Sequence, residues 1–165
     1  MKRIILSVVM AMLMFSITGC SSAKSSISKS YTYNVSVGDE TEKIKITVDT
    51  TGGLSLQDKE GNFVISTPNT EEAVTGTFGS AEDYDEYYQT VNDSSDYTLL
   101  DEGDTDESDE KGVQYFIYTC YGKAGWETDC FARIVGSDTS VIMGSLLDSK
   151  EAQEIYKKIS ISKIE

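Results

Sequence analysis

The sequence predicts an α+β domain in which one antiparallel β-sheet, arranged as a meander, is covered by two amphipathic helices. Apolar and polar residues alternate over several short stretches, which is the period of a half-buried strand. In two other stretches apolar residues recur at i, i+3, i+4 and i+7, the period of a helix with one buried face. A chain of 165 residues is long enough for one such domain.

The first strands are expected directly after residue 30. Residues 31–37 and 44–48 alternate on either side of Gly38-Asp39, which predicts a hairpin. Shorter strands are predicted at residues 53–57 and 62–66, and residues 73–78 are a further strand candidate.

The first helix is expected to begin at Ser80, because a serine followed by acidic residues is typical of a helix start. The apolar residues that then follow at helical spacing are Tyr84, Tyr87, Tyr88 and Val91. A row of tyrosines can form a shelf for a ligand. An aromatic stripe at helical spacing more often packs into a core, and we interpret it as core.

The second half of the chain is rich in β-branched and alternating residues. Strands are predicted at residues 96–101, 113–121, 127–135 and 140–147. A second helix, capped by Asp148 or Ser149, is predicted to bury the residues Ala152, Ile155, Tyr156 and Ile159. Ile161 and Ile164 then mark a short last strand.

An antiparallel meander closed by an amphipathic C-terminal helix is similar to the PsbP-like α/β/α sandwich. The resemblance extends over roughly residues 31–164 and is one of pattern, without a diagnostic motif. It supports the fold prediction and implies no functional residue.

The N-terminal segment has the features of a signal peptide. Lys2 and Arg3 precede an apolar run over residues 4–15, which is interrupted only by a serine. This run is shorter than the roughly 20 apolar residues of a membrane-spanning helix, and it ends in small residues. A cleaved export signal is therefore favoured over a permanent transmembrane helix.

The residues Ile17-Thr18-Gly19-Cys20 directly after this run resemble the lipobox of bacterial lipoproteins. The resemblance implies diacylglyceryl transfer to Cys20, cleavage of residues 1–19, and display outside the cytoplasmic membrane. The alternative is an ordinary secretory peptide with an incidental cysteine. Residues 20–30 are then a lipidated, serine-rich tether, and residues 31–165 are one extracytoplasmic domain held on the membrane.

Composition excludes several classes of function. The net charge is −14, and removing residues 1–19 takes away two of the 14 basic residues and none of the 28 acidic ones. A field of this sign repels polyanions, so we exclude nucleic acid as a partner. The chain contains no histidine, which excludes histidine-based catalytic triads and histidine metal sites. We interpret the protein as not an enzyme.

Cys120 and Cys130 lie on the two arms of a predicted hairpin that turns near Lys123-Ala124-Gly125. Facing residues of paired strands are close enough for a disulfide, and an exported protein meets an oxidising environment. We predict a structural disulfide between them. A redox-active pair is disfavoured because there is no Cys-x-x-Cys spacing, and two free thiols are the remaining alternative.

Seven of the ten residues from 101 to 110 are acidic. Asp104, Asp106 and Ser108 imitate the start of a calcium loop, but the sixth position is Asp109 instead of glycine. Most charge runs are solvated loops. A calcium site is therefore kept as an alternative, and no other cofactor is predicted.

Trp126 lies beside the predicted hairpin turn, and Tyr118, Tyr121 and Phe131 lie on the flanking strands. Exposed aromatic residues at a loop tip can enter a partner's pocket or stack on sugar rings. Cross-strand packing that only stabilises the hairpin is the simpler interpretation. If the chain has a binding surface, we expect it here.

These observations predict a non-catalytic binding or accessory module, anchored at the cell envelope, that contacts an envelope protein or wall glycan. One alternative is a small-solute- or calcium-binding lipoprotein that serves a transporter. A second is a carboxylate-based cell-wall hydrolase, because the many acidic residues permit many pairings. A structural role as a wall spacer is a third.

Overall fold

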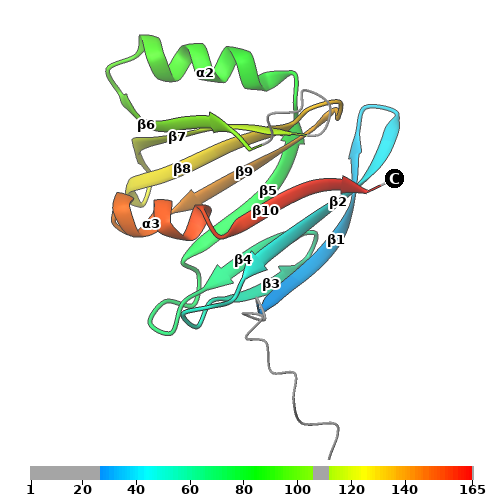
Figure 1. Ribbon diagram of the computed structural model, residues 1–165. Coiled ribbons are helices and arrows are strands. Elements are labelled where there is room, and N and C mark those ends of the chain that lie inside the picture. Colours follow the sequence, from blue (N-terminus) through cyan, green and yellow to red (C-terminus); the bar gives the residue numbers. More distant parts are fainter. Residues whose placement is uncertain (1–26, 106–111, 165) are drawn as a thin grey trace, which may run out of the picture.

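The structure is a computed structural model that describes residues 27–105 and 112–164, with ten strands and two helices in these ranges. The strands form two antiparallel sheets, one of three strands and one of seven (Figure 1). No helix within the described ranges is long and apolar enough to span a membrane.

The three-stranded sheet has the order β1-β2-β10. Its strands are β1 (Ser28–Val37), β2 (Glu40–Asp49) and β10 (Ile159–Ile164). The β1–β2 hairpin turns at Gly38, whose φ of 61° is in the left-handed region that glycine adopts without strain. β10 pairs with the other edge of β2, so that Ile161 lies opposite Ile46. The two ends of the described chain therefore close one sheet.

The seven-stranded sheet has the order β3-β4-β5-β9-β8-β7-β6. Its strands are β3 (Ser55–Lys59), β4 (Asn62–Ser66), β5 (Val74–Ser80), β6 (Tyr97–Asp104), β7 (Val113–Gly122), β8 (Gly125–Ile134) and β9 (Thr139–Ser145). The last four strands in space form a meander from β6 to β9, and β5 joins it by pairing with β9. Figure 1 shows how this sheet lies across the three-stranded one.

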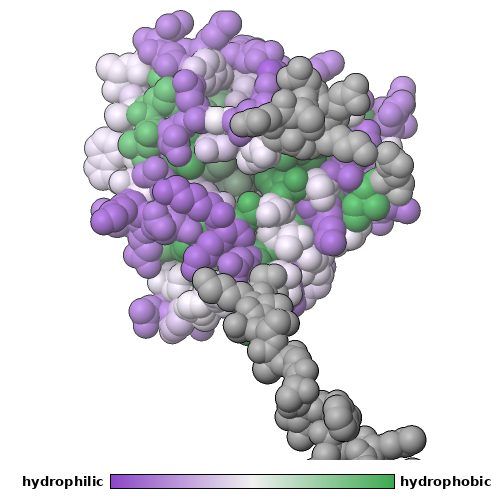
Figure 2. Space-filling model, in the orientation of Figure 1, coloured by the Kyte–Doolittle hydropathy of each residue, from purple (hydrophilic) through white to green (hydrophobic). Residues whose placement is uncertain are grey.

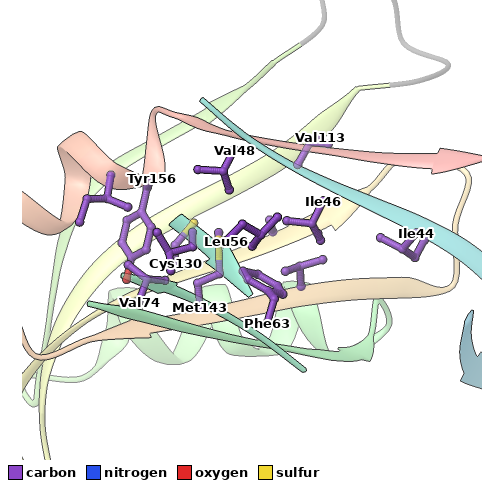
Figure 3. Packing of buried hydrophobic residues seen from close by; sticks show 14 of the residues in the cluster. Ile44, Ile46, Val48, Leu56, Phe63, Val74, Val113, Cys130, Met143 and Tyr156 are labelled. Carbon is purple, nitrogen blue, oxygen red and sulfur yellow. The ribbon is translucent and has the colours of Figure 1, made fainter. Parts of the chain in front are cut away.

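The main core fills the space between the two sheets. Ile44, Ile46 and Val48 of β2 are fully buried, because alternate residues of a strand point to the same face. They share the core with residues of the larger sheet that include Phe63, Val74 and Met143 (Figure 3). The smaller sheet therefore covers most of one face of the larger sheet.

The two helices have different positions. Helix α2 (Asp83–Asp93) covers the outer face of the larger sheet, and its buried residues are Tyr84 and Val91. Helix α3 (Ser149–Tyr156) packs against β8 at one end of the core, where the Tyr156 hydroxyl donates a hydrogen bond to the carbonyl oxygen of Thr128. Asp148 accepts a hydrogen bond from the backbone N–H of Lys150, which confirms the predicted cap of this helix.

The predicted α+β architecture is wrong. The structure is β-rich, and the face expected to lie under helices is covered by the three-stranded sheet. Residues 31–37 and 44–48 do form strands, but they belong to this second sheet instead of to one continuous meander. Helix α2 also begins at Asp83, three residues later than Ser80, and its N-cap residue Glu82 makes no side-chain capping bond.

Candidate functional site

The tip of the β7–β8 hairpin carries an exposed pair of aromatic side chains. Tyr121 and Trp126 are direct cross-strand partners, next to the two-residue turn at Lys123-Ala124. Their ring centroids are 5.6 Å apart and their planes are at 80°, an edge-to-face contact. Tyr121 is nevertheless 71% exposed and Trp126 is 66% exposed. The rings hold each other in place while most of their surface faces solvent.

The exposure follows from the lengths of the neighbouring strands. Pairing of β6 with β7 ends at Cys120, and pairing of β9 with β8 ends at Thr128. Residues 121–127 therefore pair only with β7 and β8 residues of the same hairpin, and the hairpin tip extends past the end of the sheet. Two large aromatic residues on a projecting hairpin have few neighbours to pack against besides each other.

The other two aromatic residues predicted for this surface, Tyr118 and Phe131, are in the core. Tyr118 is 2% exposed and Phe131 is 3% exposed, because both lie on the face that α2 covers. Phe131 stacks on Phe116 with ring planes at 9° and meets the edge of Tyr84 from α2. Of the four aromatic residues predicted for this surface, only Tyr121 and Trp126 are exposed.

The predicted disulfide between Cys120 and Cys130 is not formed, and both are free thiols. The register of the hairpin explains this, because Cys120 lies opposite Glu127 and Cys130 lies opposite Ile117. The two cysteines are three positions apart along the ladder and on opposite faces of the sheet. Cys130 faces the core between the sheets, whereas Cys120 faces the α2 side.

Three polar side chains gather on the α2 side of the same hairpin. One donor atom each of Cys120, Glu127 and Asp129 lies within 4.8 Å of the other two. The Cys120 thiol donates a hydrogen bond to Asp129 Oδ2 over 3.7 Å, whereas Asp129 Oδ1 is buried and has no hydrogen-bond partner. The sequence-based predictions did not include this cluster, although the position of the turn places Cys120 opposite Glu127.

Burial raises the pKa of Asp129 to about 6, and the charge of Glu127 adds to the increase. Interactions with the Tyr118 hydroxyl and the Cys120 thiol act in the opposite direction. The pKa of the Cys120 thiol is also raised, to about 11. Burial is the main cause, and the negative charge of Asp129 raises it further. The surroundings therefore disfavour the ionised forms of both Asp129 and Cys120.

Glu127 and Asp129 also line a broad groove of about 580 Å³ on this face of the sheet. Thr75, Thr77 and Gly144 line it from β5 and β9, and Lys59 and Glu72 line it as well. The two carboxylates lie side by side on one strand.

A second cavity, of about 310 Å³, lies between β10 and the larger sheet. Its apolar lining includes Tyr115, Ile117, Cys130, Ala132, Tyr156 and Ile161. Asp101, Thr105, Lys157 and Ser160 supply its polar atoms. Hydrophobic residues also reach the surface in the middle of the face that Figure 2 shows, between hydrophilic regions above and below.

Several predicted site residues lie outside the described residues. The signal peptide, the lipobox with Cys20 and most of the tether precede residue 27. Of the calcium alternative, Asp106, Ser108 and Asp109 are outside as well, whereas Asp104 ends β6 opposite Gln114. The lipid anchor and the calcium site therefore stay predictions.

A comparison of the chain with protein-family models gave no match, and a comparison with curated proteins gave none either. Function is therefore inferred from the chemistry and geometry of the residues themselves.

Proposed function

We propose that this protein is a lipid-anchored extracytoplasmic protein that acts as a non-catalytic binding module, and that it contacts an envelope protein through the Tyr121–Trp126 pair. The observation that carries the proposal is the exposure of two mutually packed aromatic rings on a projecting hairpin tip. Tyrosine and tryptophan are enriched among the residues that dominate binding energy at protein interfaces.

The size of the aromatic pair is sufficient for a binding anchor. Covering the exposed parts of both rings would remove on the order of 300 Å² of mostly apolar surface from water. At about 25 cal/mol per Å², this gives about 7 kcal/mol before the costs of association. The edge-to-face contact already restricts both side chains, so less conformational entropy is lost on binding.

The geometry of the pair favours a protein pocket over a glycan. Sugar rings stack on a flat aromatic face, and two rings at 80° do not form one flat platform. A hairpin tip with one ring edge against one ring face is a wedge, which fits a concave apolar pocket. The membrane anchor on Cys20, which we propose from the lipobox, would hold this wedge close to membrane-bound partners.

The test is a cross-linking pull-down from intact cells with the native protein, Trp126→Ala and Tyr121→Ala. Leu100→Ala is the matched control, because Leu100 is an exposed apolar residue of β6, away from the tip. We expect one envelope protein to be recovered with the native chain and Leu100→Ala, and at least tenfold less with either tip variant. Equal recovery with all four chains contradicts the proposal.

A second candidate function, the binding of a small apolar solute, is favoured by the 310 Å³ cavity. Its size is at the lower end of ligand pockets, and apolar cavities of this kind accept small apolar molecules. Ala132 is a buried residue of its lining, so Ala132→Leu should fill part of the space. We expect benzene to raise the melting temperature of the native protein and not that of Ala132→Leu. The same shift in both proteins contradicts this candidate.

A further inference from the structure

We propose that Cys120, Glu127 and Asp129 form a binding site for a thiophilic divalent cation of the Zn²⁺ class. The site is on the α2 side of the β7–β8 hairpin, at the end of the groove that crosses this face. It is separate from the contact surface at the hairpin tip, and it does not depend on that function. It is also distinct from the calcium alternative around Asp104, which offers oxygen atoms only.

The hairpin register brings the three side chains together. Cys120 and Glu127 are direct cross-strand partners, and Asp129 follows Glu127 at the next position on the same face of β8. Their donor atoms lie within 4.8 Å of one another. Metal–ligand distances of about 2.0 to 2.3 Å place the donors of a tetrahedral zinc site roughly 3.3 to 3.8 Å apart. The three donor atoms would therefore move closer together when the cation binds.

An orphaned buried oxygen atom indicates that the cluster is incomplete as it stands. Asp129 Oδ1 is shielded from solvent and has no hydrogen-bond partner, whereas Oδ2 accepts a hydrogen bond from the Cys120 thiol. The Tyr118 hydroxyl also interacts with this carboxylate. A buried carboxylate oxygen without a partner is costly. A cation between the three side chains would supply the missing partner.

Two glycines leave space for the carboxylates. A Cβ atom at Gly122 would lie 2.2 Å from a Glu127 carboxylate oxygen, and one at Gly144 would lie 3.1 Å from Asp129 Oδ1. A larger residue at Gly122 would displace the Glu127 carboxylate. The present positions of the two carboxylates therefore depend on glycine at 122 and leave little room for a side chain at 144.

The donor set determines the class of cation. A thiolate selects zinc and other soft or borderline metals, whereas calcium and magnesium prefer six or more oxygen ligands. Three protein ligands leave a fourth tetrahedral position for water, and two of the three, Glu127 and Asp129, line the groove. Binding would release the thiol proton of Cys120 to solvent.

The experiment is a Co²⁺ titration of the reduced full-length protein, purified from membranes in detergent. A thiolate ligand gives Co²⁺ a charge-transfer band in the near ultraviolet, which Zn²⁺ removes by displacement. We expect this band in the native protein and its loss in Cys120→Ser. Glu127→Gln and Asp129→Asn should each weaken Co²⁺ binding at least tenfold.

Two control variants test whether the band arises from the Cys120 thiolate. Cys130→Val removes the thiol on the opposite face of the sheet and should keep the band, as should Trp126→Ala at the hairpin tip. Zn²⁺ should also raise the melting temperature of the native protein but not that of Cys120→Ser. Absence of the band in the native protein, or its persistence in Cys120→Ser, would overturn the proposal.

Discussion

The Lys163 ammonium group of β10 lies 2.5 Å from the Glu42 carboxylate of β2, at the end of the three-stranded sheet. The same carboxylate accepts hydrogen bonds from the hydroxyl groups of Ser137 and Thr139, which belong to the turn between β8 and β9 of the larger sheet and to the start of β9. Glu42 is buried. One side chain therefore ties the two sheets together at the edge of the core.

This contact predicts a loss of stability in acid. Burial alone would raise the pKa of Glu42, but hydrogen bonds from Lys163, Ser137 and Thr139 together lower it to about 2. A lowered pKa stabilises the fold above the unfolded value of 4.5, and the contribution disappears as the pH falls from 4.5 to 2. We expect Glu42→Gln to lower the free energy of unfolding by about 2 kcal/mol at pH 7. Urea unfolding at pH 7 and pH 3 should show a smaller difference at pH 3, and a difference independent of pH would contradict this role of Glu42.

The raised pKa of Asp129 predicts a pH dependence of stability opposite in sign to that of Glu42. The pKa of Asp129 is raised to about 6, so the folded state is penalised once the pH exceeds the unfolded value of 3.8, and the penalty is complete above pH 6. We expect Asp129→Asn to increase the free energy of unfolding at pH 7 by up to about 3 kcal/mol, and to have little effect at pH 4. The measurement needs a chelator, because a bound cation would favour the carboxylate. A lower free energy of unfolding for Asp129→Asn than for the native protein at pH 7 would contradict a cost of the ionised Asp129 carboxylate.

A side chain at Gly76 of β5 is expected to clash with its neighbour in the larger sheet. Gly76 lies directly opposite Phe63, and a Cβ atom at this position would approach the phenyl ring to 2.0 Å. We expect Gly76→Ala to lower the free energy of unfolding by about 1 to 3 kcal/mol, because the phenyl ring of Phe63 is fully buried and its displacement would disturb the core packing. Gly79→Ala on the same strand is the control, since its closest neighbour would be 3.2 Å away. Thermal melts of the two variants should differ clearly, and equal melting temperatures would rule out the clash.

The proposed anchor predicts the behaviour of a Cys20→Ser variant. Without the thiol there is no site for the lipid, so the chain should leave the membrane fraction or keep residues 1–19. Fractionation and mass measurement of the product check this. Normal cleavage with unchanged membrane association would remove the basis for a lipoprotein.

The hydropathy pattern located most strands and both helices, because each depends on a local period of apolar and polar residues, two for a strand and 3.6 for a helix. It did not determine which strands pair. The contact of β10 with β2 joins residues more than 100 positions apart, and no local pattern records it. The α+β prediction was wrong because β1, β2 and β10 form a separate sheet over the face that was expected to lie under helices.

The predicted disulfide between Cys120 and Cys130 was wrong, and the position of the turn in the sequence is enough to exclude it. A turn at Lys123-Ala124 places residues at equal distances from it opposite each other, so Cys120 faces Glu127 and cannot face Cys130. Applying this register would have excluded the disulfide and revealed the Cys120–Glu127–Asp129 cluster. The burial of Tyr118 and Phe131 was harder to foresee, since it depends on where α2 lies over the sheet.

Photo-cross-linking in intact cells tests the proposed contact surface most directly. Benzoylphenylalanine would replace Trp126 at the hairpin tip or, as a control, the exposed Asn62 beside the β3–β4 turn. We predict that irradiation gives an adduct with one envelope protein from position 126 and none from position 62. The absence of a protein adduct at position 126, or identical adducts at both positions, would contradict a role of the aromatic tip in binding a protein partner.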